Sequence, residues 1–428
     1  MRPFVTAHVK GNGSTSGRYI CAMQTPVLGI VSTWFERGAT HVSLAYIQAL
    51  DAHFDIRVYA RSGDEFPHSD PKWNKDFVHW GEFVPGAPKT FIDWSDFSKW
   101  MSREKVDILL FNEQQSWDVI LRLKELKDRP LIGAYIDYYT DDTTPFFELY
   151  DFLLCNTERH YSVFKEHPGA IYIPWGVDLK SYPTKKRPER PFTFFHSLGY
   201  NPERKGTDLL VSAFSNIENP NVRLLLHAQR PLNDFNHLQD IIEKDDRIRW
   251  INEEVGPPGL YNLGDVYVYP SRLDGIGLSL PEALASGLPS IVPDEAPMNE
   301  FVKEGKNGWL VEVAKRWKRE DSYYWEMCEC DVDDLKRKME AAIQADLNSM
   351  RENTLEHARQ NLDWNKNSSK LNEALLQVKK HTASSELMVQ CRQWETAHTP
   401  SVTFKQKVHR ILIRLGARAV KRRIFGRK

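Results

Sequence analysis

The chain has 428 residues, of which 41% are hydrophobic and 27% charged, and its formal net charge is −1. This length suits two domains, and the composition excludes an intrinsically disordered chain. The near-neutral charge gives no sign of a polyanionic partner for the chain as a whole, and no apolar run reaches the roughly 20 residues that span a bilayer.

Residues 1–25 include a glycine- and serine-rich stretch and lack the long apolar core of a signal peptide, so we expect a flexible N-terminal segment. Over residues 26–180, short apolar runs alternate with helical patterns. Such runs predict buried parallel strands, and the alternation predicts a doubly wound, Rossmann-like sheet. We expect strands at 27–31, 55–59, 107–111, 130–135, 153–155 and 170–174, with helices at 41–52 and 116–127.

Residues 181–191 read SYPTKKRPERP, a proline-rich and charged composition that is typical of a linker. A second alternation over 192–365 predicts a second Rossmann-like domain. Because ligands bind at the carboxyl ends of the strands in such sheets, two facing domains predict a binding cleft between them. We expect strands at 192–196, 222–227, 248–251, 266–269, 290–292 and 309–311, and helices at 206–216, 235–244, 281–286 and 296–304.

The alternation of strand and helix patterns stops at 314–330, where we expect a loop with local aromatic packing. Helical patterns return at 332–345 and 351–380, and residues 366–385 are predicted to form a crossover helix. Residues 386–428 are predicted to be a basic amphipathic tail, because the last 28 residues contain no acid and are rich in Lys and Arg. Such a helix favours an anionic membrane surface. A solvated tail, or a helix that binds acidic protein or nucleic acid, stays open.

The five cysteines are odd in number and lack framework spacing, which indicates a reducing, cytoplasmic compartment. Cys328 and Cys330 are too close for a zinc knuckle, and no second His or Cys pair follows them. We therefore expect no metal site.

Residues 270–289, PSRLDGIGLSLPEALASGLP, carry the most informative pattern. A strand runs into a glycine loop that begins with Asp274, and Glu282 follows after seven intervening residues. Gly275 and Gly277 allow backbone amides to approach an anion closely, and the next helix presents its positive end. One carboxylate can accept a sugar hydroxyl and the other the ribose hydroxyls, so the pattern predicts a sugar-nucleotide site. A helix cap or loop acid at Asp274, and a surface acid at Glu282, stay open.

A second motif, Gly199–Gly206, joins a strand to a helix and contains Arg204 and Lys205. Fixed cations at this turn can neutralise a diphosphate as it leaves, which stabilises a transition state more than a ground state. The alternative is a solvated basic turn.

Together these motifs resemble the retaining GT-B glycosyltransferases of family 4. The resemblance rests on Arg204-Lys205-Gly206, on Tyr261 and Asp265, on the 270–289 segment, and on Ile173–Asp178, and it covers about residues 26–380. It implies the GT-B fold, with two Rossmann-like domains facing across a cleft and a C-terminal helical extension. It also implies a nucleotide-diphosphate sugar as donor, with no separate cofactor.

By that resemblance, the C-terminal domain holds the donor. Glu282 would bind the ribose, Asp274 the sugar hydroxyls, and Lys205 a phosphate. The amides of the loop would face the diphosphate or sugar, which makes Gly275, Gly277 and Leu278 donor-binding candidates. The family usually has Glu where this chain has Asp274, and Arg where it has Tyr200, so Arg204 is expected to supply the missing cation.

In the N-terminal domain, Gly38 and Ala39 resemble the segment that covers the donor phosphates. The family often has a His after the strand that ends at Phe111, whereas this chain has Asn112-Glu113-Gln114. Glu113 is the candidate acid near the acceptor, with a loop role as the alternative. Asp137 and Tyr138 are candidates for acceptor binding. His41 and His196 are expected to be structural.

The resemblance predicts transfer of a hexose to a hydroxyl of a glycan or glycolipid acceptor in surface polysaccharide assembly. We expect a cytoplasmic enzyme, bound through its tail to the inner face of the membrane, with no nucleic-acid partner. Two rivals stay open: an epimerase or phosphorylase of the same architecture, and a non-catalytic subunit that binds sugar nucleotides or is recruited to membranes.

Overall fold

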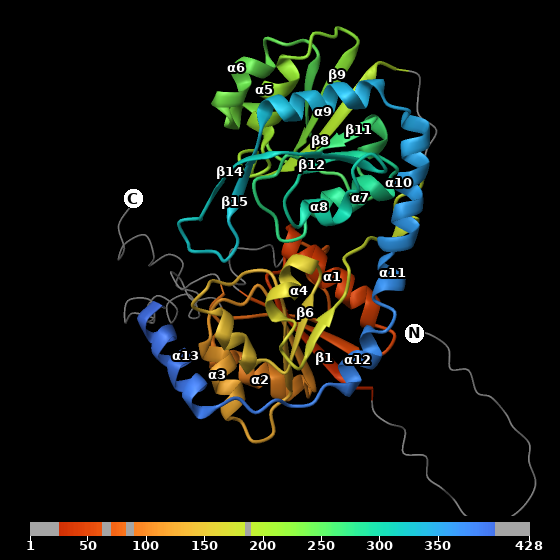
Figure 1. Cartoon of the computed structure of the whole chain (residues 1–428). Helices are drawn as coiled ribbons and strands as arrows, with labels where there is room; N and C mark the ends of the chain where they lie inside the picture. Colours follow the sequence, from red (N-terminus) through yellow and green to blue (C-terminus); the bar gives the residue numbers. More distant parts are fainter. Residues whose placement is uncertain (1–24, 62–69, 83–89, 185–189, 399–428) are drawn as a thin grey trace, which may run out of the picture.

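The computed structural model describes residues 25–61, 70–82, 90–184 and 190–398, which form two α/β domains stacked one above the other (Figure 1). The N-terminal domain contains a seven-stranded sheet in the order β3-β2-β1-β4-β5-β6-β7, in which every pair is parallel. Its strands are β1 (Val27–Ser32), β2 (Asp55–Ala60), β3 (Val78–Trp80), β4 (Ile108–Asn112), β5 (Leu131–Tyr135), β6 (Phe152–Cys155) and β7 (Ala170–Tyr172). Its helices are α1 (Gly38–Leu50), α2 (Trp94–Glu104), α3 (Asp118–Glu125) and α4 (Glu158–Phe164), with 3₁₀ helices η2 (Thr144–Leu149) and η3 (Leu179–Ser181).

The C-terminal domain contains a six-stranded parallel sheet in the order β10-β9-β8-β11-β12-β13. Its strands are β8 (Phe192–Gly199), β9 (Val222–Ala228), β10 (Ile248–Asn252), β11 (Val266–Val268), β12 (Ser290–Pro293) and β13 (Gly308–Val311). Its helices are α5 (Thr207–Ser215), α6 (Asn236–Ile242), α7 (Ser279–Ala285), α8 (Met298–Phe301), α9 (Val332–Gln344) and α10 (Leu347–Asn361), with 3₁₀ helices η4 (Leu232–Asp234) and η5 (Tyr261–Leu263). The two facing Rossmann-like sheets confirm the predicted fold.

The strand order positions the site. In each sheet the order reverses between the first and fourth strands of the domain, β1 and β4 or β8 and β11. Ligands bind outside the carboxyl ends of the strands at such a switch point. The loops that follow these four strands carry four of the predicted motifs, which contain Gly38, Glu113, Lys205 and Asp274.

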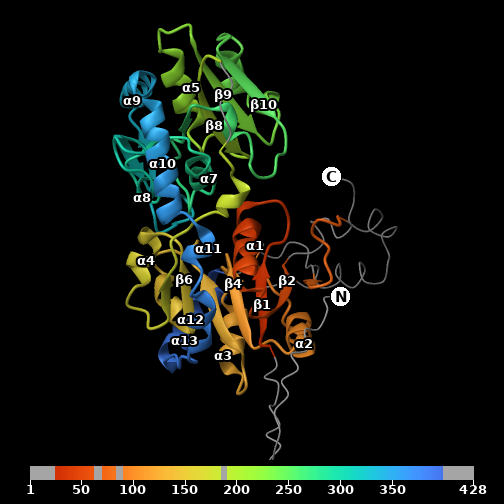
Figure 2. The same ribbon diagram turned by 90° about the vertical axis from the view of Figure 1, so that its right-hand side faces the viewer.

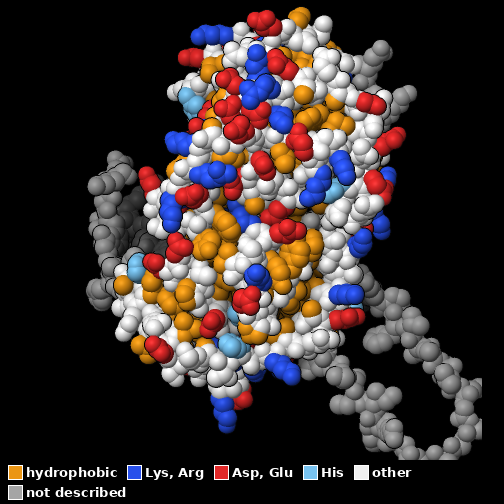
Figure 3. All heavy atoms as spheres, viewed as in Figure 1, with side chains coloured by type: hydrophobic (Ala, Val, Ile, Leu, Met, Phe, Trp, Pro, Cys, Tyr) orange, Lys and Arg blue, Asp and Glu red, His pale blue; other side chains and the backbone are white. Residues whose placement is uncertain are grey.

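The strands form because their sequences are continuously apolar. All six residues of β1 are buried, and Leu28 and Ile30 are fully so. Both faces of such a strand are covered, as the parallel sheet requires. Figure 3 shows the outer surface of the face seen in Figure 1, where charged side chains of both signs intermingle over the C-terminal domain and hydrophobic side chains gather over the N-terminal domain.

The polypeptide returns from the second domain to the first along one side of the molecule, as both views show (Figures 1 and 2). The predicted crossover helix over 366–385 is wrong as a single helix: the segment contains the end of α11 (Trp364–Asn367), α12 (Leu371–Gln377) and extended chain. The helices are short because Trp364 anchors the crossing point. Its ring centroid lies 4.9 Å from that of Trp175, and its Nε1 donates to the Ala45 carbonyl at 2.9 Å.

The predicted tail divides into two parts. Its first part forms α13 (Ser385–His398), which packs on α3 and η2 of the N-terminal domain and buries Leu387, Cys391 and Glu395. The expectation of a free tail is therefore wrong for these residues, because one face of α13 packs on the N-terminal domain. The basic part, 399–428, lies outside the described residues, as do residues 1–24.

The loop predicted at 314–330 is confirmed only for residues 318–326, where Tyr324 and Trp325 pack on the N-terminal core in keeping with the expected aromatic packing. The flanking residues form strands. They contribute to the antiparallel hairpin of β14 (Val313–Trp317) and β15 (Met327–Cys330), which extends from the C-terminal domain toward the N-terminal domain (Figure 1). The two strands were not predicted because they are short and their aromatic and charged composition is also typical of loops. The sequence patterns also gave no expectation for β3, α2 or α4. In the described part of the chain, no helix combines the length and apolar character needed to cross a bilayer.

Glu395 joins α13 to the N-terminal domain. Its carboxylate accepts hydrogen bonds from Ser116 Oγ at 2.7 Å and from the Trp117 amide at 2.9 Å. Because Glu395→Ala leaves two buried donors unsatisfied, we expect it to lower the free energy of unfolding by about 1–3 kcal/mol, measured by urea denaturation. Glu386→Ala, at an exposed position of the same helix, is the matched control and should change stability little. Equal effects of the two variants would contradict this role.

Candidate functional site

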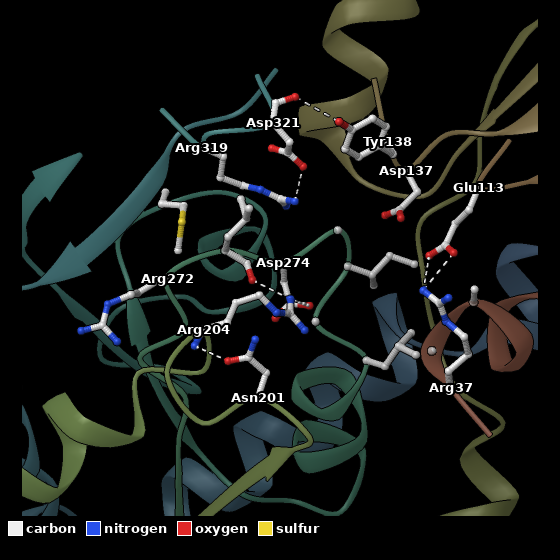
Figure 4. Close-up of a pocket in the computed structure, with 18 of the residues that line it drawn as sticks. Arg37, Glu113, Asp137, Tyr138, Asn201, Arg204, Arg272, Asp274, Arg319 and Asp321 are labelled. Atoms are coloured by element: carbon white, nitrogen blue, oxygen red, sulfur yellow. Dashed lines mark hydrogen bonds and ion pairs between the residues drawn. The ribbon is translucent and has the colours of Figure 1, made fainter. Parts of the chain in front are cut away.

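A cavity of about 990 Å³ lies between the two domains, lined by loops at the carboxyl ends of both sheets and by the β14–β15 hairpin (Figure 4). Ten of the twelve predicted site residues line it: Gly38, Ala39, Glu113, Asp137, Tyr138, Arg204, Asp274, Gly275, Gly277 and Leu278. Lys205 and Glu282 do not. Asp274 brings Lys205 to the edge of the cavity, whereas Glu282 belongs to a separate cluster.

Asp274 is the centre of the C-terminal wall. One carboxylate oxygen accepts from Lys205 Nζ at 2.6 Å and from Ser271 Oγ at 3.1 Å, and the other lies 3.2 Å from an Arg204 guanidinium nitrogen. Burial raises the pKa of Asp274, but Lys205 and Arg204 outweigh it, so the pKa lies well below the usual range. The carboxylate is therefore ionised at every physiological pH.

Lys205 is held by the same cluster. Its Nζ also contacts the Tyr269 hydroxyl, which donates to Asp274 at 2.5 Å. Burial lowers the pKa of Lys205 to about 8, and Asp274 opposes that shift. The ammonium remains mainly protonated at neutral pH, so we describe this contact as an ion pair.

The glycine loop follows directly. Gly277 has φ +81°, a left-handed conformation that only glycine adopts readily. At Gly275, an added Cβ would lie 2.1 Å from Oδ1 of Asp137, so any other residue would displace that carboxylate. The loop thus brings a carboxylate of the first domain against the backbone of the second.

Glu282 lies on α7 and accepts a hydrogen bond from the Tyr261 hydroxyl at 2.6 Å. A second hydrogen bond comes from Tyr182. Burial raises the pKa of Glu282, and the two hydroxyls oppose that shift. The carboxylate is therefore a buried acceptor next to the cavity and not part of its wall.

Glu113 lies in the part of the cavity wall that the N-terminal domain contributes. It has φ +52° and forms an ion pair with Arg37 at 3.0 Å. The buried Arg61 guanidinium donates to the carbonyls of Asn112 and Glu113 and to Gln114 Oε1, the last at 2.6 Å. These bonds hold the turn after β4 in a left-handed conformation that a non-glycine residue adopts at an energetic cost.

Asp137 lies between the two walls. Burial, followed by the neighbouring Glu113 and Asp274 carboxylates, raises the pKa of Asp137 to about 7, and Arg159 partly offsets the shift. The repulsion that Asp137 feels from the Glu113 and Asp274 carboxylates is relieved when Asp137 holds a proton.

Arg159 on α4 joins the domains beneath the cavity. Its guanidinium donates to the Asp274 carbonyl and, at 2.6 Å, to the Ala296 carbonyl, and it lies 5.1 Å from the Trp325 ring centroid. Glu300 of the second domain accepts from the Arg159 amide at 2.9 Å. The sequence analysis missed Arg159, and no local signal could have found it, because its partners lie more than 100 residues away.

The hairpin residues that line the cavity were also missed. They are Lys315, Trp317, Arg319, Asp321, Met327 and Glu329. Val313–Trp317 reads VAKRW and Met327–Cys330 reads MCEC, and neither has the period of two that is typical of strands, so no local signal indicated the hairpin. His196 lies buried between Val268 and Thr207, which fits the structural role expected of it. Within the described ranges, no group of three or more His, Cys, Asp or Glu residues could hold a metal ion.

The chain is similar in sequence to known glycosyltransferases. Residues 190–319 match the family model described as "Glycosyl transferases group 1". The GtfA subunit of the UDP-N-acetylglucosamine–peptide N-acetylglucosaminyltransferase of Streptococcus gordonii is 31% identical over 173 residues, 36% of this chain and 31% of that protein. The lipopolysaccharide core biosynthesis mannosyltransferase LpsB of Rhizobium meliloti is 37% identical over 60 residues, 14% of this chain and 17% of that protein. The chain spans about a third of the length of the GtfA relatives.

Solved structures share the fold. Sucrose-phosphate synthase of Thermosynechococcus elongatus superposes with a TM-score of 0.63 and 16% identity, over 82% of this chain and 98% of that one. Anabaena HepE in complex with UDP gives a TM-score of 0.64 and 15% identity, over 82% of this chain and 100% of that one. These findings confirm the predicted GT-B fold and the predicted resemblance to glycosyltransferases, which is most specific in the C-terminal domain.

The raised pKa of Asp137 gives a test of this geometry. The folded protein binds more protons than the unfolded chain between about pH 4 and 7, so Asp137 makes stability fall as pH rises through that window. Asp137→Asn removes this effect. We expect the variant to melt about 2–4 °C above the parent protein near pH 8, the shift that roughly 1 kcal/mol produces, and to differ little near pH 4.

Asp141→Asn is the matched control, since Asp141 is exposed and lies 3.3 Å from Lys318. Thermal melts across the pH range check both variants. A difference for Asp137→Asn that does not grow with pH contradicts the placement of this carboxylate among like charges.

Proposed function

We propose that the chain is a glycosyltransferase that moves a hexose from a nucleotide-diphosphate sugar to an acceptor hydroxyl, with retention at the reacting carbon. One observation carries the proposal: Asp274 opens a glycine loop and is paired with Lys205 and Arg204 at the interdomain cavity, inside the segment that matches the group 1 family. The pairing supports the proposal, because it offers two cations to a diphosphate and a carboxylate that can accept from sugar hydroxyls.

Donor binding would change the ion-pair partners of Asp274, Arg204 and Lys205. In the structure described here, Asp274 has ion pairs with Arg204 and Lys205. Diphosphate oxygens would take over both cations, which leaves the Asp274 carboxylate to accept sugar hydroxyls. The cations then neutralise the charge that grows on the departing diphosphate, an effect that is large in a site that excludes water.

Glu282 would accept the ribose hydroxyls. Tyr261 and Tyr182 already occupy part of its hydrogen-bonding capacity and fix its orientation, while an ionised carboxylate has further lone pairs to offer. HepE, which shares the fold, is described in complexes with UDP and with UDP-glucose, so uridine nucleotides are the first donors to test.

The N-terminal wall would bind the acceptor and complete the reaction. Gly38 and Ala39 would cover the donor phosphates, and Glu113, held by Arg37, would lie near the reacting carbon. Asp137 and Tyr138 would position the acceptor hydroxyl. In the retaining course, the C1–O bond to the diphosphate breaks, the acceptor oxygen bonds to C1 from the same face, and its proton passes to the leaving phosphate oxygen.

For the acceptor, we propose a hydroxyl of a glycan or glycolipid in the assembly of a surface polysaccharide, at the inner face of the membrane. Two relatives support this class: LpsB, and a phosphatidyl-myo-inositol mannosyltransferase of Mycobacterium tuberculosis, 21% identical over 233 residues. Membrane attachment would come from the basic residues 399–428. A peptide hydroxyl is the second candidate, because two relatives are named as GtfA subunits of a peptide N-acetylglucosaminyltransferase.

A thermal-shift screen tests donor binding. We expect a uridine or guanosine diphosphate, or its sugar conjugate, to raise the melting temperature by about 3 °C or more at 100 times its dissociation constant, since such a ligand adds about 2.7 kcal/mol to stability. The matching nucleoside is the control and should shift it less, because it lacks the diphosphate. If no nucleotide shifts the melting temperature, the donor site is wrong.

The second test concerns catalysis. Lys205→Ala should reduce hydrolysis or transfer of the best radiolabelled nucleotide sugar by about 100-fold or more, because a charge-stabilising group is lost. Lys336→Ala, on the outer side of α9, should not change the rate. Turnover by Lys205→Ala at the parent rate would contradict the proposed role. Nucleotide binding without any turnover, whatever acceptor is supplied, would favour the non-catalytic subunit.

A further inference from the structure

The β14–β15 hairpin has two chemically different faces. Its register pairs Lys315 with Glu329 and Trp317 with Met327, and all four side chains line the cavity. The residues between them face the other way: Arg316 forms an ion pair with Glu295 at 2.8 Å, and Cys328 is buried against the domain. The alternation of a strand therefore assigns one face of the hairpin to the cavity and the other to the protein.

The hairpin is fixed to the N-terminal domain next to the acceptor candidates. Tyr323 donates to the Asp137 carbonyl at 3.0 Å, Tyr138 donates to the Asp321 carbonyl at 3.1 Å, and Thr140 forms a β-bridge with Tyr323. The Tyr138 and Tyr323 rings stack with centroids 5.4 Å apart. The hairpin thus supports the segment that would position an acceptor hydroxyl.

Figure 4 shows where this face lies along the cavity. Arg319 and Arg272 lie toward one end, Arg37 and Glu113 lie toward the other, and Asp274 and Asp137 lie between them. The cations proposed for the donor diphosphate lie with Asp274 in the middle of the cavity, and the hairpin lines the end away from Arg37.

The chemistry of the hairpin end suits a neutral, hydroxyl-rich ligand. Two of its cations are paired with carboxylates, Arg319 with Asp321 and Arg272 with Glu329, so a polyanion would meet carboxylates as well as cations. Lys315 Nζ lies 5.0 Å from the centroid of the Trp317 ring, and no carboxylate of the described residues lies within salt-bridge distance of it. An aromatic face beside a donor and an acceptor matches a sugar ring, which has an apolar C–H face and a rim of hydroxyls.

We propose that this face, formed by Lys315, Trp317, Met327 and Glu329, is a subsite for a sugar ring of a neutral saccharide acceptor. The inference rests on the proposed function, since it names the acceptor class of the same cavity. Trp317 covers the apolar face of the ring, while Lys315 donates to its hydroxyls and Glu329 accepts from them. The subsite would make the protein select a glycan over a small alcohol.

The test uses saturation-transfer NMR with the full chain and a panel of neutral disaccharides of glucose, galactose, mannose and N-acetylglucosamine. We expect at least one disaccharide to bind the parent protein. We expect Trp317→Ala to weaken that binding at least about tenfold, equivalent to roughly 1.4 kcal/mol. Arg316→Ala, on the opposite face of the same strand, is the matched control and should bind as the parent does. Lys315→Ala, at an exposed position, should weaken binding severalfold and serves if Trp317→Ala does not fold.

A serine- and threonine-containing peptide and inorganic phosphate are tested in parallel, and UDP binding is followed by thermal shift. The proposal is overturned if no disaccharide binds, if the Trp317 and Lys315 variants bind it like the parent, or if the peptide or phosphate instead depends on Trp317. A UDP shift without disaccharide binding would overturn the subsite and leave the proposed function standing. Disaccharide binding that depends on Trp317, without any nucleotide shift, would support the subsite and contradict the proposed function.

Discussion

The organisation of the site depends on one buried charge cluster. A carboxylate removed from water costs several kcal/mol unless cations and hydrogen bonds compensate it. Lys205, Arg204, Ser271 and Tyr269 provide that compensation for Asp274. Because two of these partners lie in the loop after β8 and the others follow β11, the cluster ties together the two loops at the switch point of the sheet. The position of the glycine loop, and of everything it faces, follows from this constraint.

The N-terminal domain completes the site through contacts that leave little freedom at the interface. Arg159 donates to the carbonyl of Asp274, and Asp137 lies against Gly275. The hairpin holds the carbonyl of Asp137 from the other side through Tyr323. The same contacts that join the domains therefore set the distances among the acids that face the cavity. In this arrangement the donor wall, the acceptor candidates and the hairpin form one continuous surface.

Much of this could be predicted from the sequence, because the signals were local. The apolar runs of the strands and the Gly275–Gly277 pair are read within about ten residues, and ten predicted site residues line the cavity. The failures share a cause. The hairpin was taken for a loop because its strands, VAKRW and MCEC, are short and do not alternate between apolar and polar residues. The residues after 385 were taken for a tail because the bond between Glu395 and Ser116 spans 279 residues.

The sequence by itself determined the two parallel sheets, the order of their motifs, and the chemical groups that each loop carries, since strand periodicity and loop chemistry depend on neighbouring residues. Only the tertiary structure decided which groups meet. It placed Glu282 with Tyr261 and outside the cavity wall, raised the pKa of Asp137 by burying it and placing it near like charges, and brought Trp317 into the same cavity. These outcomes depend on burial and on distances between residues far apart in the chain, which no local pattern specifies.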